Sequence, residues 1–360
     1  MVMRLPRLNP RQVLRYAAIG ASALCVVPLA RAATALGGFG GGSEYHAELV
    51  NVPAKSYVPS FTLDSLAGRS GHLRVAFLTR EDVEAIPSLV QKFGPDAKET
   101  GVRSIAFPRD NSEFAFVTLK PWKEKIGSYV NAYHVGRWPG ERRNMPDNYD
   151  NPIGFIEVTP ENMDLRLSTH FSLSSFITHD QENVWPKYVV MREELLDKLE
   201  LVIDELQKAG ISVSHMSVMS GFRTPWYNRN GGRTGGRAEL SRHMYGDAAD
   251  VFVDNNRDGR MDDLNRDGDV NFMDTDVINR AVERVEQQYP ELVGGLGLYR
   301  AIGPSGPFAH IDVRGTRARW TNTRKGRSLA VNSSAGDVRR VVPTGTCKAP
   351  PEFAYLCKRK

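Results

Sequence analysis

The chain has 360 residues, of which 41% are hydrophobic and 25% are charged, and this composition excludes a disordered or fibrous protein. The length suffices for two folded units, and no repeat at a solenoid period is present. The 47 Lys and Arg exceed the 42 Asp and Glu by five, and residues 1–32 alone hold five arginines and no acid. Because the rest is nearly neutral and has no basic run interleaved with aromatics, we expect no nucleic acid as a partner.

Residues 1–32 have the pattern of a secretory signal peptide. Four arginines precede an apolar stretch at residues 17–29, and the small-residue pattern Ala30-Arg31-Ala32 follows as a cleavage site. The apolar stretch is short for a membrane span. We therefore expect a periplasmic or otherwise exported protein associated with the cell envelope, without stable membrane insertion unless the signal remains uncleaved.

A glycine-rich linker at residues 33–43 precedes a predicted β-rich module at residues 44–161. Strand-like alternation or apolar continuity occurs in three segments, residues 72–79, 113–119 and 129–135. The aromatics of residues 133–140 belong either to the core of this module or to a surface that stacks on a glycan or docks a partner. The sequence assigns this module no role.

A second unit, residues 162–325, is predicted to be an α+β domain with an antiparallel sheet. Apolar residues recur at helical spacing from Leu195 to Leu206, and Gly210 is placed to end that helix. Residues 211–220 then have the pattern of a strand.

Two further predicted strands, residues 247–253 and 308–313, carry side chains that suit a zinc ion. His243, Asp250 and His310 would supply three ligands, and a catalytic zinc keeps one further position open for water. Neighbouring strands would hold such ligands rigidly. The alternative is that His243 is structural and Asp250 is a turn or capping residue.

Four ordered blocks of the chain resemble the D-alanyl-D-alanine metallopeptidases of the M15 type, in their periplasmic murein-peptidase branch. The blocks are residues 220–228, 241–250, 295–299 and 308–320. The resemblance implies a zinc peptidase with His243, Asp250 and His310 as ligands and with Arg223 contacting the carboxylate or carbonyl of the substrate. It also implies a peptidoglycan substrate, in which a murein endopeptidase or D,D-carboxypeptidase cuts a bond that involves D-alanine or diaminopimelate.

The general base is the point at which this chain departs from the family pattern. Relatives place a glutamate or an aspartate three residues before the last histidine, where this chain has Pro307. Asp312 projects on the same side of its strand as His310. It either accepts a proton from the zinc-activated water or orients His310 from behind. If the base has been lost, the alternative is a non-catalytic cell-wall binding or regulatory protein that retains the fold.

A second metal signal lies at residues 254–274, between the two ligand-bearing strands. Two loops place oxygen side chains at loop positions 1, 3 and 5 and a glycine at position 6, a spacing that wraps calcium. These side chains are Asp254, Asn256 and Asp258 in the first loop and Asp263, Asn265, Asp267 and Asp274 in the second. The second loop resembles those of dockerins and precedes a predicted helix. The alternative is a pair of solvated turns, because Asp, Asn and Gly are ordinary turn formers.

The C-terminal tail, residues 326–360, contains Cys347 and Cys357. An exported protein meets an oxidising compartment, so the sequence predicts a disulfide between these two cysteines. The alternative is a pair of free thiols in a mobile tail.

Overall fold

The computed structural model describes residues 67–107, 112–231, 237–300, 305–324 and 327–330. The predicted signal peptide, the glycine-rich linker and the two cysteines of the tail lie outside these ranges. None of the helices within them combines the length and the apolar character that crossing a membrane requires.

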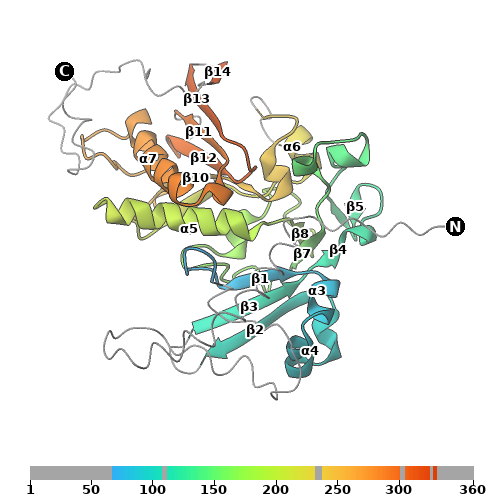
Figure 1. The fold of residues 1–360 in the computed structure, drawn as a ribbon. Helices are drawn as coiled ribbons and strands as arrows, with labels where there is room; N and C mark the ends of the chain where they lie inside the picture. Colours follow the sequence, from blue (N-terminus) through green and yellow to red (C-terminus); the bar gives the residue numbers. More distant parts are fainter. Residues whose placement is uncertain (1–66, 108–111, 232–236, 301–304, 325–326, 331–360) are drawn as a thin grey trace, which may run out of the picture.

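A six-stranded sheet forms the C-terminal part of the described chain, in the order β14-β13-β11-β12-β10-β9 (Figure 1). Its strands are β9 (Met216–Ser220), β10 (Ala248–Val253), β11 (Gly295–Tyr299), β12 (Phe308–Asp312), β13 (Ala318–Arg324) and β14 (Arg327–Ala330). Neighbours in this sheet are antiparallel except β11 and β13, which are parallel. The predicted α+β fold with an antiparallel sheet is confirmed.

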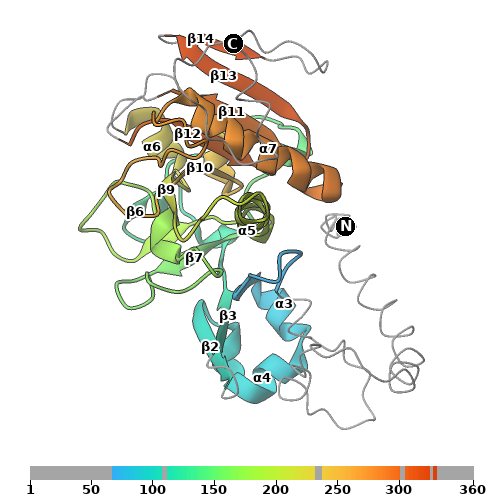
Figure 2. The same ribbon diagram turned by 90° about the vertical axis from the view of Figure 1, so that its left-hand side faces the viewer.

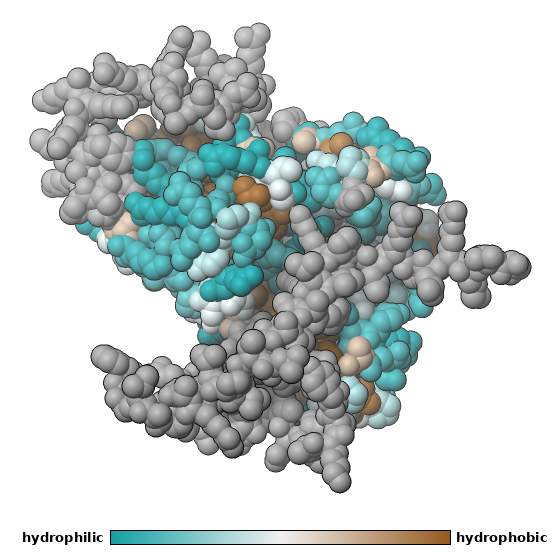
Figure 3. Space-filling view, in the orientation of Figure 1, coloured by the Kyte–Doolittle hydropathy of each residue, from teal (hydrophilic) through white to brown (hydrophobic). Residues whose placement is uncertain are grey.

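The α-helices are α3 (Arg80–Glu84), α4 (Pro87–Phe93), α5 (Glu193–Lys208), α6 (Pro225–Asn230) and α7 (Phe272–Gln288). Helices α5 and α7 lie on the side of the six-stranded sheet, whereas α3 and α4 belong to the N-terminal part. The short 3-10 helices are η1 (Pro95–Lys98), η2 (Trp122–Glu124), η3 (Pro139–Glu141), η4 (Asp147–Tyr149), η5 (Leu173–Phe176), η6 (Arg242–Tyr245) and η7 (Pro290–Leu292). Helix α7 packs on α5, β11 and β12. On the face of the molecule drawn in Figure 3, the described side chains are mostly hydrophilic.

Helix α5 confirms the helix predicted from periodicity, and it ends where the glycine was expected to end it. Leu195, Leu199 and Val202 are fully buried on one face of the helix. Gly210 has a positive φ of 77°, and the amide of Ile211 donates to the carbonyl of Leu206, which closes the last turn. Figure 2 shows α5 nearly end-on, between the large sheet and the N-terminal part.

The N-terminal part contains three smaller sheets. Their strands are β1 (Val75–Leu78), β2 (Gly101–Phe107) and β3 (Ser112–Thr118), then β4 (Lys120–Pro121), β7 (Gly154–Val158) and β8 (Lys187–Val189), and finally β5 (Tyr129–Val130) with β6 (Tyr133–His134). Helices α3 and α4 pack against the first sheet and enclose a small core of their own. The strands predicted at residues 72–79 and 113–119 are present as β1 and β3, whereas residues 129–135 form a hairpin of β5 and β6.

The module expected at residues 44–161 is not a separate packing unit. Strand β7 pairs with β8 beyond that boundary, with Ile156 opposite Val189, and one hydrophobic core extends from Leu73 to Val313. Strand β8 has three residues, too few for periodicity to reveal it. Tyr133 and Trp138 are 1% and 0% exposed, so these two aromatics belong to the core and not to a glycan-binding surface.

Below the six-stranded sheet, a buried ion-pair network joins two helices, α5 and α7, to two of its strands, β12 and β13. Lys198 of α5 is fully buried, and its Nζ donates to Glu286 Oε1 of α7 at 2.7 Å and to the carbonyl of Asp312 in β12 at 2.8 Å. Glu286 also accepts from Arg319 Nη2 of β13 at 2.5 Å. Burial lowers the pKa of Lys198, and the charge of Glu286 opposes that effect. The network fixes β12 against both helices.

Replacing Lys198 with alanine should lower the free energy of unfolding by about 3–5 kcal/mol, because Glu286 would lose one of its buried partners. The matched control is Lys208→Ala in the same helix, since Lys208 is exposed and pairs with Glu205 across one turn. That change should cost less than about 1 kcal/mol. Urea unfolding measures both, and equal losses would contradict the importance assigned to the buried network.

Candidate metal centre

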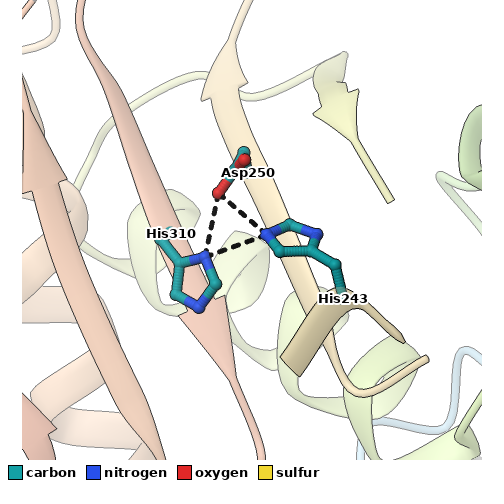
Figure 4. A group of neighbouring side chains, drawn as sticks. All are labelled: His243, Asp250 and His310. Atoms are coloured by element: carbon teal, nitrogen blue, oxygen red, sulfur yellow. Dashed lines mark hydrogen bonds and ion pairs between the residues drawn. The ribbon is translucent and has the colours of Figure 1, made fainter. Parts of the chain in front are cut away.

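Three predicted ligands come together from three separate elements (Figure 4). His243 lies on η6, Asp250 on β10 and His310 on β12, where Asp250 and His310 are directly opposite in the antiparallel register. One ligand atom of each lies within 4.8 Å of the others. Gly246 turns the chain from η6 into β10 with a φ of 64°, and a Cβ there would lie 2.1 Å from the carbonyl oxygen of Val190.

The facing atoms are close and buried. Nε2 of His243 lies 3.1 Å from Nδ1 of His310, and Asp250 Oδ1 lies 3.3 Å from the first nitrogen and 2.9 Å from the second. The exposed fractions of the side chains are 2% for His243, 8% for Asp250 and 9% for His310. Water therefore contributes little to the solvation of these three groups.

The outer partners of the two imidazoles determine which nitrogens carry hydrogen. Nδ1 of His243 lies 2.7 Å from the carbonyl oxygen of Gly221, which can only accept, so Nδ1 donates. Nε2 of His310 lies 3.2 Å from Asp312 Oδ2 and donates to that carboxylate. In the neutral rings, Nε2 of His243 and Nδ1 of His310 then direct lone pairs at Asp250.

Three acceptors that face one another in a buried space are stabilised by a cation between them. Burial lowers the pKa of His243 to about 4, with the charge of Arg223 acting in the same direction, so this ring is neutral and able to bind a metal. Burial opposes protonation of His310, but hydrogen bonds to Asp250 and Asp312 outweigh it and raise its pKa. Two imidazoles and a carboxylate form a donor set that zinc uses in catalytic sites. The residues present thus fit a zinc ion.

Arg223 is brought to the metal group, as expected, and there it contacts a ligand. Its Nη2 donates to Asp250 Oδ2 at 2.5 Å, and its Nε donates to the hydroxyl of Ser220 at 2.7 Å. Its backbone amide donates to the carbonyl of His243 at 3.2 Å. Arg223 therefore fixes the second oxygen of Asp250 and leaves Oδ1 toward the two histidines.

Asp312 lies behind His310, on the side of the ring away from Asp250. It is fully buried, and its Oδ1 accepts from the amide of Gly295 at 2.7 Å and from Arg314 Nε at 2.9 Å. Burial alone would raise the pKa of this carboxyl, but hydrogen bonds from His310 and Arg314 hold it well below its usual range. Of the two roles considered for Asp312, the geometry favours orientation of His310 over acceptance of a proton from water.

Glycines allow the strand beside Asp312 to approach it. A Cβ on Gly294 would lie 1.9 Å from the carbonyl oxygen of Asp312, and one on Gly295 would lie 2.2 Å from its Oδ2. These two positions therefore admit no side chain.

Two aromatic residues of the site were not predicted to have a role. Gly297 lies between His310 and Trp320 in the sheet register, and a Cβ there would meet the indole at 2.2 Å. Trp320 thus crosses Gly297, lies 5.2 Å from the His310 ring between centroids, and donates from Nε1 to the hydroxyl of Tyr299 at 2.8 Å. Burial raises the pKa of Tyr299, and the charges of Asp250 and Arg223 also act on it in opposite directions.

The hydroxyl of Tyr299 is therefore held by Trp320, whose indole also contacts His310. Its ring stacks on Phe308 with centroids 4.6 Å apart and an interplanar angle of 3°. Both Tyr299 and Trp320 stand within the blocks that carry the family resemblance, but only the strand register reveals that Trp320 meets His310 and that Tyr299 bonds to Trp320.

The proposed calcium loops fold as two turns of the same geometry. Asp254 accepts from the amides of residues 258 and 259, and Asp263 accepts from those of residues 267 and 268. Asp274 accepts from the amides of Leu264 and Asn271, and the second bond belongs to the cap of α7. Among the described residues, the one group of three His, Cys, Asp or Glu side chains that could hold an ion is that of His243. The calcium prediction gains no support.

A segment of the chain that contains part of this site matches a known protein family. Residues 170–282 match the family described as Peptidase M15, and the match includes Arg223, His243 and Asp250. The match supports an M15-type metallopeptidase, and the geometry of the three acceptor atoms agrees with it. No curated protein and no solved structure matches the chain.

Replacing Asp312 with asparagine should lower zinc affinity about 10–100-fold, because His310 would lose the carboxylate that fixes its ring and its tautomer. Competition with a chromophoric chelator measures the affinity. Asp276→Asn serves as the control, since Asp276 pairs with Arg280 on α7. An unchanged affinity in a folded Asp312→Asn variant would contradict the orienting role.

Proposed function

We propose that the protein is a zinc peptidase that hydrolyses peptide bonds in peptidoglycan stems or cross-links. The observation that carries the proposal is the convergence of three buried acceptor atoms from His243, Asp250 and His310 within the M15-type segment. M15 peptidases are zinc-dependent, and zinc, when bound, supplies an acidified water and polarises the scissile carbonyl.

Arg223 and Tyr299 would act on the substrate. Arg223 remains 13% exposed, and its charge would hold a substrate carboxylate or the negative charge that develops on the scissile carbonyl oxygen. The hydroxyl of Tyr299 accepts from Trp320, so its own hydrogen stays available to donate to the same oxygen. Asp312 would hold His310 in the tautomer that leaves Nδ1 free for the metal.

The substrate follows from the resemblance and from the predicted export signal. An exported peptidase of this type meets peptidoglycan in the cell envelope, where murein endopeptidases and D,D-carboxypeptidases act. A non-catalytic binding or regulatory protein is the competing function, favoured by Pro307, which stands where relatives carry an acid.

Digestion of peptidoglycan with a defined set of muropeptides tests this function. The protein from residue 33 onward is incubated with the substrate in its zinc-loaded form, after chelation, and after zinc is restored. We expect specific fragments, identified by mass spectrometry, that disappear on chelation and return with zinc. Intact substrate in the presence of folded, zinc-loaded protein would instead support the non-catalytic function.

Replacing Tyr299 with phenylalanine should reduce kcat about 100- to 1,000-fold, the usual loss when one donor to an oxyanion is removed. Zinc content and KM should change little, because the hydroxyl is neither a ligand nor the main contact of the bound substrate. Tyr289→Phe is the control, since the Tyr289 hydroxyl contacts Gln288 in an exposed position. Equal kcat values for the two variants would remove Tyr299 from the reaction.

A further inference from the structure

A pocket of about 380 Å³ near η3 and α6 has five arginines among its lining residues. Its charged residues are Arg137, Arg142, Arg143, Arg229, Arg237 and Glu239. Five arginines against one glutamate give the pocket an excess of four positive charges. The near-neutral balance of the chain beyond the predicted signal does not account for this local concentration.

The arginines come from segments that are distant in sequence. Three of them surround η3, while Arg229 belongs to α6 and Arg237 follows it. Figure 1 shows α6 beside the green segments that precede it in the chain. The positive charge of this pocket is therefore a property of the fold and not of one basic run.

Two of these arginines, Arg237 and Arg142, donate to backbone carbonyls, which do not compensate their charge. Arg237 donates to the carbonyls of Tyr227 and Gly231 at 2.8 and 2.6 Å and lies 4.7 Å above the Tyr227 ring. Arg142 donates to the carbonyl of Arg137 at 3.3 Å. The carboxylate in the pocket wall, Glu239, lies 3.8 Å from Arg143. Gathered guanidinium groups repel one another unless an anion lies between them.

The pocket and the metal centre share two chain segments. Pro225 lines the pocket and stands two residues after Arg223, and Met244 lines it and follows His243 directly. Trp138, which precedes η3, connects this segment to η6, because its Nε1 donates to the carbonyl of Met244 at 2.8 Å. The segments that carry Arg223 and His243 therefore also form part of the pocket wall.

We propose that this arginine pocket, defined by the residues above, binds carboxylates of the peptide substrate that are remote from the bond to be cut. Guanidinium groups pair with carboxylates in a bidentate geometry. Stem peptides that contain diaminopimelate offer such free carboxylates. The inference rests on the proposed function for its substrate class, and it adds that the enzyme prefers stems whose carboxylates are free over stems whose carboxylates are amidated.

A pair of matched stem peptides, one with free and one with amidated carboxylates, tests the proposal. The variant Arg137→Gln/Arg229→Gln removes two exposed cations of the pocket without touching the anchored Arg237. We expect KM for the free acid to rise about tenfold, with kcat unchanged and with the amidated peptide unaffected. The control Lys123→Gln/Arg260→Gln removes the same charge from exposed positions outside the pocket and should leave KM unchanged.

Binding of the same labelled peptides to the zinc-loaded protein, measured by fluorescence anisotropy, separates this proposal from the function itself. If neither peptide is cleaved, the proposed hydrolysis fails, whereas a tenfold weaker binding of the free acid to the pocket variant still supports the pocket. Equal binding of both peptides to the wild type and the variant would overturn the proposal. The proposal would also be overturned if a polyphosphate displaced the labelled peptide at concentrations where the unlabelled free-acid peptide does not, because the pocket would then prefer phosphates to carboxylates.

Discussion

The antiparallel pairing of β10 with β12 is the constraint on which the site depends. This register sets Asp250 opposite His310, and the same face continues across Gly297 to Trp320. A shift of one residue would turn Asp250 and His310 to opposite faces of the sheet. The carboxylate of Asp312 then lies behind the imidazole, so that one strand supplies both the ligand and the group that orients it.

The interior below the sheet supports this register electrostatically. Lys198 binds the carbonyl of Asp312 from α5, while Glu286 of α7 connects Lys198 to Arg319 of β13. These charges are buried, so each depends on its partners in place of water. The positions of α5, α7 and β12 are consequently coupled. Because β12 carries His310, this coupling also fixes one side of the metal group.

The sequence predicted the parts of the site that local pattern controls. Apolar spacing with a glycine stop located α5, and the spacing of His243, Asp250 and His310 within β-rich segments identified the three candidate ligands that the fold brings together. Contacts that depend on strand register could not be predicted, because Trp320 meets His310 and Tyr299 meets Trp320 only after three strands pair. For calcium, the sequence predicted a site that the structure does not support, since the same spacing of Asp and Asn also occurs in ordinary turns.

Short strands explain why the predicted boundary at residue 161 does not coincide with a break in the packing. Strand β8 has three residues and no periodicity, yet it joins residues on both sides of position 161 in one sheet. The arginine pocket was equally hidden, because its cations are dispersed in the sequence and meet only around η3 and α6. The composition of any one segment therefore does not reveal that these arginines meet in the folded protein.

The most direct test of the central claim is a crystal structure of the zinc-loaded protein with anomalous diffraction recorded at the zinc edge. The account predicts one zinc ion bound by Nε2 of His243, Nδ1 of His310 and a carboxylate oxygen of Asp250, at about 2.0–2.2 Å. It also predicts Asp312 hydrogen-bonded to the far nitrogen of His310. An anomalous peak at other residues, or none in a folded protein saturated with zinc, would contradict the account.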